Sequence, residues 1–358
     1  MERRRDEPFR ERFARAVGGA KKGLKKMRTE SEGYAREAAY QIKDLLPGRK
    51  RHDSAADILA GLTGERKFIS SEFFYDDTGS SLFEEITRLP EYYLNRTEKR
   101  LIRAAGGRIC PVRDNTTIIE LGSGDCSKIT VLLSCAAPER RDMICYMPVD
   151  ISRAAIEWSA RELVKRFPGL RVRGVVADFS GGLDMLPGDG NRLFCFFGST
   201  LGNLERDAGL DFIRDTAEIM NPGDIFLLGL DMVKDTAVLE RAYNDGKRVT
   251  ERFNKNILRV VNSLADTDFD PDRFDHVAFY NREKARIEMH LEAREDMRVS
   301  TPRAAEDIFI RKAERIHTEN SHKFTEKDIH VMAGVSGLEV QELFADENKW
   351  FSLVQLKK

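Results

Sequence analysis

The 358-residue chain lacks the features that mark membrane-spanning, secreted and disulfide-bonded proteins. No apolar run approaches the roughly 18 residues that a transmembrane helix needs, and the N-terminal segment is charged where a signal peptide would be apolar. The five cysteines are odd in number and include no C-x-x-C pair, which argues against a disulfide framework and against a zinc site. We therefore expect a cytoplasmic globular protein with free thiols, no bound metal and no transmembrane segment.

The formal net charge is only −1, yet the charges are unevenly distributed. Residues 1–52 hold 16 Lys and Arg against 8 Asp and Glu, which gives this segment +8 and leaves −9 for the rest of the chain. Such a charge-rich segment is typical of a flexible or helical extension outside the fold. Weak contact with an anionic surface is the alternative role, and we expect no nucleic-acid partner.

A glycine turn at residues 122–124 organises the remaining sequence. An apolar run at 118–121 leads into Gly122-Ser123-Gly124, and a helical pattern follows, so the segment reads as strand, tight turn and helix. Glycines allow a ligand to approach the backbone, and the helix N-terminus offers unpaired N–H groups. The dinucleotide fingerprint is incomplete because Ser127 stands at the third glycine position, which favours S-adenosylmethionine over the nicotinamide cofactor of an oxidoreductase. A purely structural turn is the alternative.

Further strands, each followed by a helical pattern, come after this turn. Apolar runs end at Asp150, at Asp178-Phe179, at Gly198 and at Asp231. Five βα units in succession predict an α/β protein with a doubly wound sheet, in which the carboxyl ends of the strands gather at one edge. We expect Asp150 to bind ribose hydroxyls there, although the same residue could cap a helix.

Residues 236–322 change character, from charged helices to strand-like alternation, and predict an inserted substrate domain. His317 and His322 with Glu319 between them suggest a metal site. Strand alternation, however, would place His317, Glu319 and Ser321 on one face and His322 on the other, so we expect no metal. Closing strands are expected near 340–344 and 350–356.

Several strings, in order along the chain from residue 54 to the C-terminus, carry a resemblance to a known family. They are Phe74-Tyr75-Asp76-Asp77, Leu89-Pro90-Glu91-Tyr92-Tyr93, Glu120-Leu121-Gly122-Ser123-Gly124, Gly198-Ser199-Thr200-Leu201-Gly202-Asn203, Asp231-Met232-Val233-Lys234, Ile287-Glu288-Met289 and Thr318-Glu319-Asn320-Ser321. The sequence resembles the histidine-specific Nα-methyltransferases of ergothioneine biosynthesis, which use S-adenosylmethionine.

The resemblance implies a Rossmann-like class I methyltransferase sheet with an inserted α+β substrate-binding domain. The methyltransferase domain would comprise 97–235 plus 323–358, and the substrate domain 53–96 plus 236–322. The implied cofactor-binding residues are Gly122, Lys128, Asp150, Asp178 and Phe179. The implied substrate-binding residues are Asn203 and Tyr243 at the carboxylate, and Met289, Glu319 and Ser321 at the imidazole. The implied catalytic residues are Tyr75, Tyr92 and Gly198, which would line the side of the reacting amine.

The implied reaction is three successive methyl transfers to the α-amine of L-histidine, giving hercynine. Glu319 would provide selectivity, because a buried carboxylate without an imidazole partner penalises other side chains. His317, Asn320 and His322 depart from the family pattern. An N-methyltransferase of another aromatic or imidazole-bearing amino acid is therefore the alternative enzyme, and a cofactor fold kept for binding or scaffolding is the alternative outside catalysis.

Overall fold

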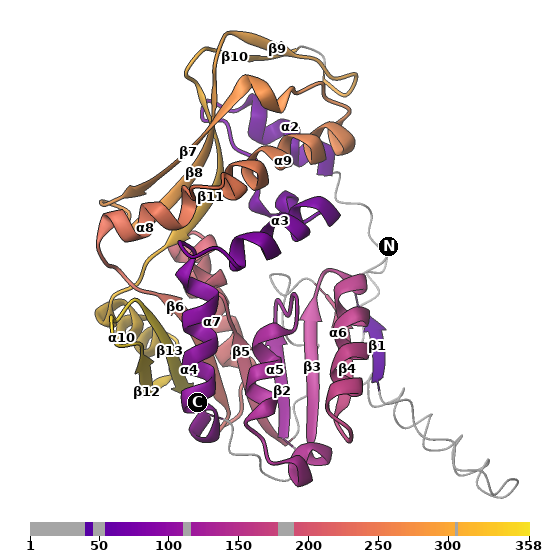
Figure 1. Ribbon diagram of the computed structural model, residues 1–358, viewed down its shortest axis with the longest axis vertical. Coiled ribbons are helices and arrows are strands. Elements are labelled where there is room, and N and C mark those ends of the chain that lie inside the picture. Colours follow the sequence, from indigo (N-terminus) through magenta and orange to yellow (C-terminus); the bar gives the residue numbers. More distant parts are fainter. Residues whose placement is uncertain (1–39, 46–53, 110–115, 178–189, 305–306) are drawn as a thin grey trace, which may run out of the picture.

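The computed structural model describes residues 40–45, 54–109, 116–177, 190–304 and 307–358, which form two lobes (Figure 1). The larger lobe is built on an eight-stranded sheet of order β1-β4-β3-β2-β5-β6-β13-β12. β1 to β6 are mutually parallel, whereas β13 runs antiparallel to both β6 and β12. The strands are β1 (Tyr40–Asp44), β2 (Thr116–Leu121), β3 (Ile144–Asp150), β4 (Arg171–Val176), β5 (Asn191–Phe196), β6 (Ile225–Asp231), β12 (Glu339–Ala345) and β13 (Phe351–Lys357). This order confirms the predicted doubly wound α/β class.

Helices cover both faces of the large sheet because its central strands are apolar on both sides. The side chains of Ile118 and Tyr146 belong to one buried core with α4, α5 and α6, whereas those of Ile119 and Met147 belong to a second core with α7 and α10. The helices are α4 (Tyr93–Ile109), α5 (Ser127–Ser134), α6 (Arg153–Arg166), α7 (Arg206–Ile219) and α10 (Glu326–Val335). Short 3-10 turns lie at Pro138–Met143 and Thr200–Asn203.

The smaller lobe stands over one end of the large sheet (Figure 1). Its three-stranded antiparallel sheet has the order β11-β8-β7, and α9 packs against α2 and α3. The elements are α2 (Ser54–Thr63), α3 (Asp77–Thr87), α8 (Thr236–Tyr243), α9 (Val249–Ala265), β7 (Phe274–Asn281), β8 (Arg286–Ala293), β9 (Met297–Val299), β10 (Ile308–Ile310) and β11 (Arg315–His322), with 3-10 turns at Ser71–Phe74 and Pro271–Arg273. The core of this lobe is continuous with the α4–α6 side of the large sheet.

The exit of β11 connects the smaller lobe to the carboxyl end of β6. Phe324 N–H donates to Asp231 O at 2.9 Å, and Val233 N–H donates to Phe324 O at 2.9 Å. The segment that follows Ser321 is therefore fixed to the edge of the large sheet at which parallel strands end. Residues from both lobes meet at this edge, the usual ligand position of an open α/β sheet.

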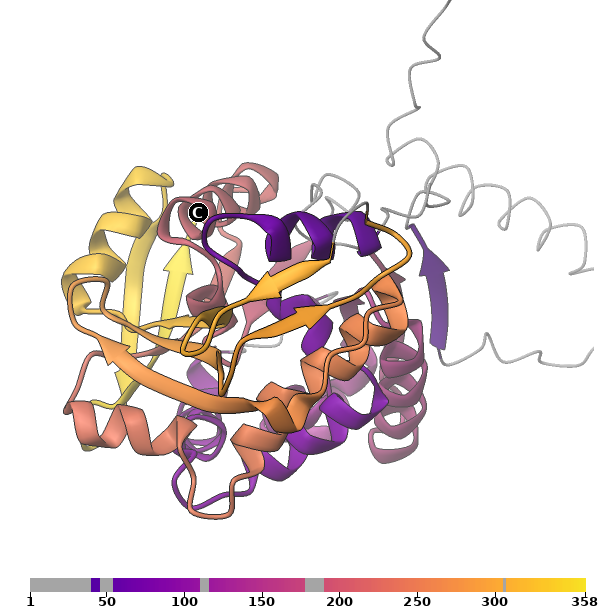
Figure 2. The same cartoon turned by 90° about the horizontal axis from the view of Figure 1, so that it is seen from above.

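One expectation from the sequence needs correction. Part of the basic segment is a strand, because Tyr40–Asp44 pairs in parallel with β4 and covers an edge that would otherwise expose unpaired backbone groups; Figure 2 shows β1 at the edge opposite β12 and β13. Within the described ranges, no helix is long and apolar enough to cross a bilayer.

Candidate active site

The glycine turn follows β2 at the carboxyl edge of the large sheet. Gly122 and Gly124 both have positive φ, at 66° and 50°. The Gly124 N–H donates to Asp150 Oδ2 at 3.1 Å, and the Ser152 N–H donates to Asp150 Oδ1 at 2.9 Å. Ser152 itself caps α6, so Asp150 is not the helix cap that was the alternative. These two backbone bonds hold the Asp150 carboxylate beside the turn.

Beside the glycine turn, buried hydroxyls lack hydrogen-bond partners in the described structure, which suits a nucleotide-like cofactor. The hydroxyls of Ser123 and Ser127 are buried without a hydrogen-bond partner in the described structure. A Cβ built on Gly124 would meet nothing within 4 Å, so the space beside this residue is open. Orphaned hydroxyls and the N-terminus of α5 beside such a space fit a polar ligand. Asp178 and Phe179 lie outside the described residues.

Glu98, which sequence reasoning missed, joins the glycine-turn helix to the loop after β5. Its side chain is 0% exposed; Lys128 Nζ lies 3.1 Å from its Oε2, and the Gly198 N–H donates to both carboxylate oxygens at 2.9 Å. Gly198 has φ 82°, and a Cβ there would lie 2.7 Å from Lys128 Nζ. The sequence signal that could have found Glu98 was its position, because it lies on the apolar stripe of α4 between Leu94 and Ile102.

A β-bulge in β11 decides which side chains enter the site. Glu319 pairs with Met289 of β8, but His317 pairs with His290, because the register shifts between His317 and Glu319. The bulged Thr318 turns inward, where its hydroxyl donates to Asn254 Oδ1 at 2.7 Å. The expectation that His317 shares a face with Glu319 is therefore wrong.

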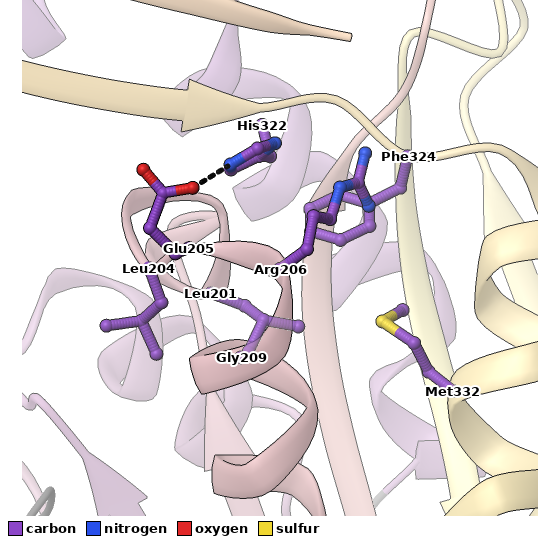
Figure 3. A pocket seen from close by; sticks show the side chains of 8 residues that line it. All are labelled: Leu201, Leu204, Glu205, Arg206, Gly209, His322, Phe324 and Met332. Carbon is purple, nitrogen blue, oxygen red and sulfur yellow. Dashed lines mark ion pairs between the residues drawn. The ribbon is translucent and has the colours of Figure 1, made fainter. Parts of the chain in front are cut away.

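The three positions that depart from the family pattern share the opposite face of β11. The three residues pair with every second residue of β8, namely His290, Glu288 and Arg286, and so lie on one face. His317 Nε2 lies 2.9 Å from Asn320 Oδ1. Figure 3 shows His322 among the side chains that line a pocket. Its Nε2 lies 4.0 Å from Glu205 Oε2. Burial, with nearby arginines, lowers the pKa of His322 to about 4, so it is neutral there. No group of three or more His, Cys, Asp or Glu side chains in the described ranges could hold a metal ion.

Four of the substrate residues implied by the resemblance converge on the other face. The Tyr243 hydroxyl donates to Ser321 Oγ at 2.8 Å, and Asn203 Nδ2 lies 3.5 Å from Glu319 Oε1. Burial raises the pKa of the Glu319 carboxyl to about 7, although Lys323 opposes the shift. Met289 is buried in the core beside them. The Glu319 carboxylate therefore has one long hydrogen bond and lies next to the hydroxyls of Ser321 and Tyr243.

Tyr75 and Tyr92 lie near the same groups. The Tyr92 and Tyr243 rings meet edge to face at 6.2 Å, and Phe83 contacts both Tyr75 and Tyr92. Burial of the hydroxyl ends, with Glu319 and Tyr243 nearby, raises the pKa values of Tyr75 and Tyr92. Both phenols are therefore neutral at ordinary pH, and 47% of Tyr75 remains exposed.

A buried charge cluster lies beneath Ser321 and Tyr243. Asp231 Oδ2 lies 2.9 Å from Lys323 Nζ, Asp231 Oδ1 accepts from Lys234 at 2.5 Å, and the Tyr93 hydroxyl donates to the same carboxylate at 2.8 Å. Burial alone raises the pKa of Asp231, but the two lysines lower it overall. Sequence reasoning assigned no role to this cluster, because its members come from three separate segments.

The two groups of residues adjoin through one short turn. Gly198, held by Glu98, begins the turn, and Asn203, beside Glu319, ends it. Between them Ser199 has φ 57° and accepts from the Asp231 N–H at 2.9 Å. The six-residue turn at 198–203 therefore connects the two groups. Its first residue is linked through Glu98 to the helix that follows the glycine turn, and its last residue lies beside Glu319.

Comparison with known proteins gives consistent matches. A family model described as histidine-specific methyltransferase, SAM-dependent, matches residues 54–358. Histidine N-alpha-methyltransferase from Mycolicibacterium smegmatis is 37% identical over 306 residues, which covers 84% of this chain and 95% of that protein. Ergothioneine biosynthesis protein 1 from Neurospora crassa is 30% identical over 273 residues, covering 74% of this chain and 30% of that protein.

More distant relatives have other named substrates. A 4-dimethylallyltryptophan N-methyltransferase from Claviceps purpurea is 24% identical over 342 residues, covering 89% of this chain and 99% of that protein. Among solved structures, the CcbJ methyltransferase from Streptomyces caelestis is 14% identical with a TM-score of 0.43, covering 76% of this chain and 97% of that one.

Proposed function

The chain belongs to the family of histidine-specific, S-adenosylmethionine-dependent methyltransferases, and from this membership we propose that it methylates the α-amine of L-histidine. Three successive transfers would give hercynine, the trimethylated product of the ergothioneine pathway. We further propose that the enzyme acts in the cytoplasm and that its basic N-terminal segment makes weak contact with an anionic surface.

The observation that carries the substrate assignment is the Glu319 carboxylate. It is buried, its pKa is raised to about 7, and its hydrogen bond to Asn203 is 3.5 Å long. A buried carboxylate with so weak a partner is costly unless a ligand supplies a donor. An imidazole N–H meets that need, while Ser321 serves the second ring nitrogen. Phenyl and aliphatic side chains would leave the carboxylate unpaired.

The carboxylate of the amino acid would lie at Asn203, whose amide N–H groups can donate to it. The family resemblance also implies Tyr243 for this task. Its hydroxyl has one proton, which is directed to Ser321 at 2.8 Å, so Tyr243 could reach a carboxylate only by releasing Ser321. We therefore assign the main carboxylate contact to Asn203 and give Tyr243 a part at the ring.

The cofactor would rest on the glycine turn, with Asp150 at its ribose, and supplies a methyl group on a sulfonium centre. Lys128 and Gly198, both held by Glu98, fix the loop between cofactor and amino acid. The chain's contribution is alignment of the amine with the methyl group, an effect worth several kcal/mol. Asp178 and Phe179 keep their proposed role at the adenine.

The attacking amine must be neutral, so its ammonium protons have to leave. Tyr75 and Tyr92 are neutral phenols, which can accept a hydrogen bond from the amine and orient it but do not act as anionic bases. Tyr75 is partly exposed, and we propose that the released protons reach solvent beside it.

The test is a panel of amino acids incubated separately with the enzyme and S-adenosylmethionine, followed by mass measurement. We expect mass gains of one, two and three methyl groups on histidine and none on phenylalanine or leucine. Tryptophan and 4-dimethylallyltryptophan test the alternative substrate. No gain on histidine by a folded protein that binds the cofactor would refute the substrate assignment.

A further inference from the structure

Lys323 follows β11 and is 0% exposed, directly beneath the proposed ring pocket. Its Nζ lies 2.7 Å from Ser321 Oγ, 2.9 Å from Asp231 Oδ2 and 3.3 Å from the Tyr243 hydroxyl. Burial alone lowers the pKa of Lys323, but Asp231 and the Tyr243 hydroxyl raise it overall, so the group is an ammonium. An ammonium only donates hydrogen bonds, so each of these oxygens accepts from it.

The hydrogen bonds that Ser321 Oγ accepts leave its own proton unused. A serine hydroxyl has two lone pairs and one proton, and Ser321 Oγ accepts from both Lys323 and the Tyr243 hydroxyl. The Tyr243 hydroxyl is a stronger acid than the Ser321 hydroxyl, so Tyr243 is the favoured donor in the bond between them. With both lone pairs used, the Ser321 proton is free to be donated into the pocket.

We propose that Lys323 is a positioning residue that commits the Ser321 hydroxyl to donating, so that the site takes a neutral imidazole with its N–H on Glu319 and its bare nitrogen on Ser321. This inference rests on the proposed function, because it concerns the ring of the amino acid substrate. An imidazolium has N–H groups at both positions and would oppose the Ser321 proton.

The buried charges agree with a neutral ring. With Glu319 ionised, Asp231 and Glu319 balance Lys234 and Lys323, so an imidazolium would add an unpaired positive charge to a dry site. The other titratable or charged groups facing the cluster are five tyrosines with raised pKa values, an arginine that donates to the Lys323 carbonyl at 2.8 Å, and a carboxylate that interacts with Lys234: Tyr75, Tyr92, Tyr93, Tyr243, Tyr280, Arg206 and Asp346.

The experiment compares two substrates at the same pH, so that titrations of the enzyme and of the α-amine largely cancel. One is L-histidine, and the other is 1,2,4-triazol-3-yl-L-alanine, whose ring has the same N–H and bare nitrogen positions but is far less basic. The ratio of kcat/KM for histidine to that for the analogue is measured from about pH 5 to about pH 8. Below the imidazole pKa of about 6.5, the ratio should fall about tenfold per pH unit in the wild-type enzyme.

Lys323→Met removes the ammonium and keeps a similar shape. Ser321 can then rotate and accept from a charged ring, so the pH dependence of the ratio should flatten, while kcat/KM for histidine at about pH 8 falls about 10- to 100-fold. Lys234→Met is the matched control, because Lys234 contacts the same Asp231 but neither Ser321 nor Tyr243. It should keep the wild-type slope of the ratio.

Ser321→Ala provides a test if Lys323→Met folds poorly, because it should flatten the ratio by itself. Where Lys323→Met does fold, adding it to Ser321→Ala should not alter the ratio further. A flat ratio in the wild-type enzyme would overturn the inference, since Ser321 would then accept from the ring. So would an unchanged slope in folded Lys323→Met, or failure of a histidine-methylating enzyme to use the triazole. Absence of any histidine methylation would instead refute the proposed function itself.

Discussion

Replacing Glu319 by glutamine should make the protein more stable and less active. Glu319→Gln keeps the shape of the side chain and removes an ionisable group from a buried site. The Asn203 amide, 3.5 Å away, compensates the carboxylate poorly in the absence of substrate. The site therefore keeps a charge whose favourable partner would arrive only with the ligand.

The stability effect follows from the pKa of Glu319, which burial raises from 4.5 to about 7. Because the folded-state pKa is above the unfolded-state value, the cost of ionisation is absent below about pH 4.5, grows between the two values and is complete above about pH 7. A shift of this size corresponds to about 3 kcal/mol. At about 2.1 cal/mol/K of unfolding entropy per residue, Glu319→Gln should raise the Tm by about 4 °C at pH 8 and by much less at pH 5.

The activity effect has the opposite sign. A neutral amide oxygen accepts the ring N–H less strongly than a carboxylate, and the lost charge-assisted bond is worth about 1.5–3 kcal/mol. We expect kcat/KM for histidine to fall about 10- to 150-fold with cofactor affinity unchanged, and Glu319→Ala to lower turnover further. The ratio of wild-type to Glu319→Gln activity should rise with pH through about 7, as Glu319 ionises.

Three measurements check this reasoning: calorimetric unfolding at the two pH values, initial rates with histidine across the pH range, and cofactor titration. Lower stability of Glu319→Gln at pH 8 would refute it, because the carboxylate would then be satisfied by the protein itself. Equal losses of histidine activity and cofactor affinity would contradict the assignment of Glu319 to the ring.

Three further substitutions test the cofactor side. Glu98→Gln leaves Lys128 without its buried carboxylate, so unfolding free energy should drop by about 2–3 kcal/mol and cofactor affinity should fall; wild-type values for both in calorimetry and titration would contradict this reading. Asp150→Asn should weaken cofactor binding about tenfold with little change in Tm, and an unchanged dissociation constant would remove Asp150 from the site. Gly198→Ala forces a Cβ to within 2.7 Å of Lys128 Nζ at φ 82°, so we expect strain of about 1–3 kcal/mol in denaturant unfolding and reduced kcat, whereas full activity would show that this loop tolerates displacement.

The sequence by itself determined the α/β class, the strand-turn-helix at Gly122 and the closing strands. These depend on local signals: the apolar period of strands and helices, and glycines where the backbone needs positive φ. The rare strings between Phe74 and Ser321 also identified the family. In each case the information lies in residues that are close together along the chain.

Tertiary structure alone decided which side chains meet. The bulge at Thr318 is held by Asn254 of α9, so no local pattern could show that His317 turns away from Glu319. The cluster draws Tyr93 and Lys323 from distant segments to Asp231 and its neighbour Lys234, and these charges meet only after folding. Pairing between buried groups depends on packing across the two lobes, which residue order does not encode locally.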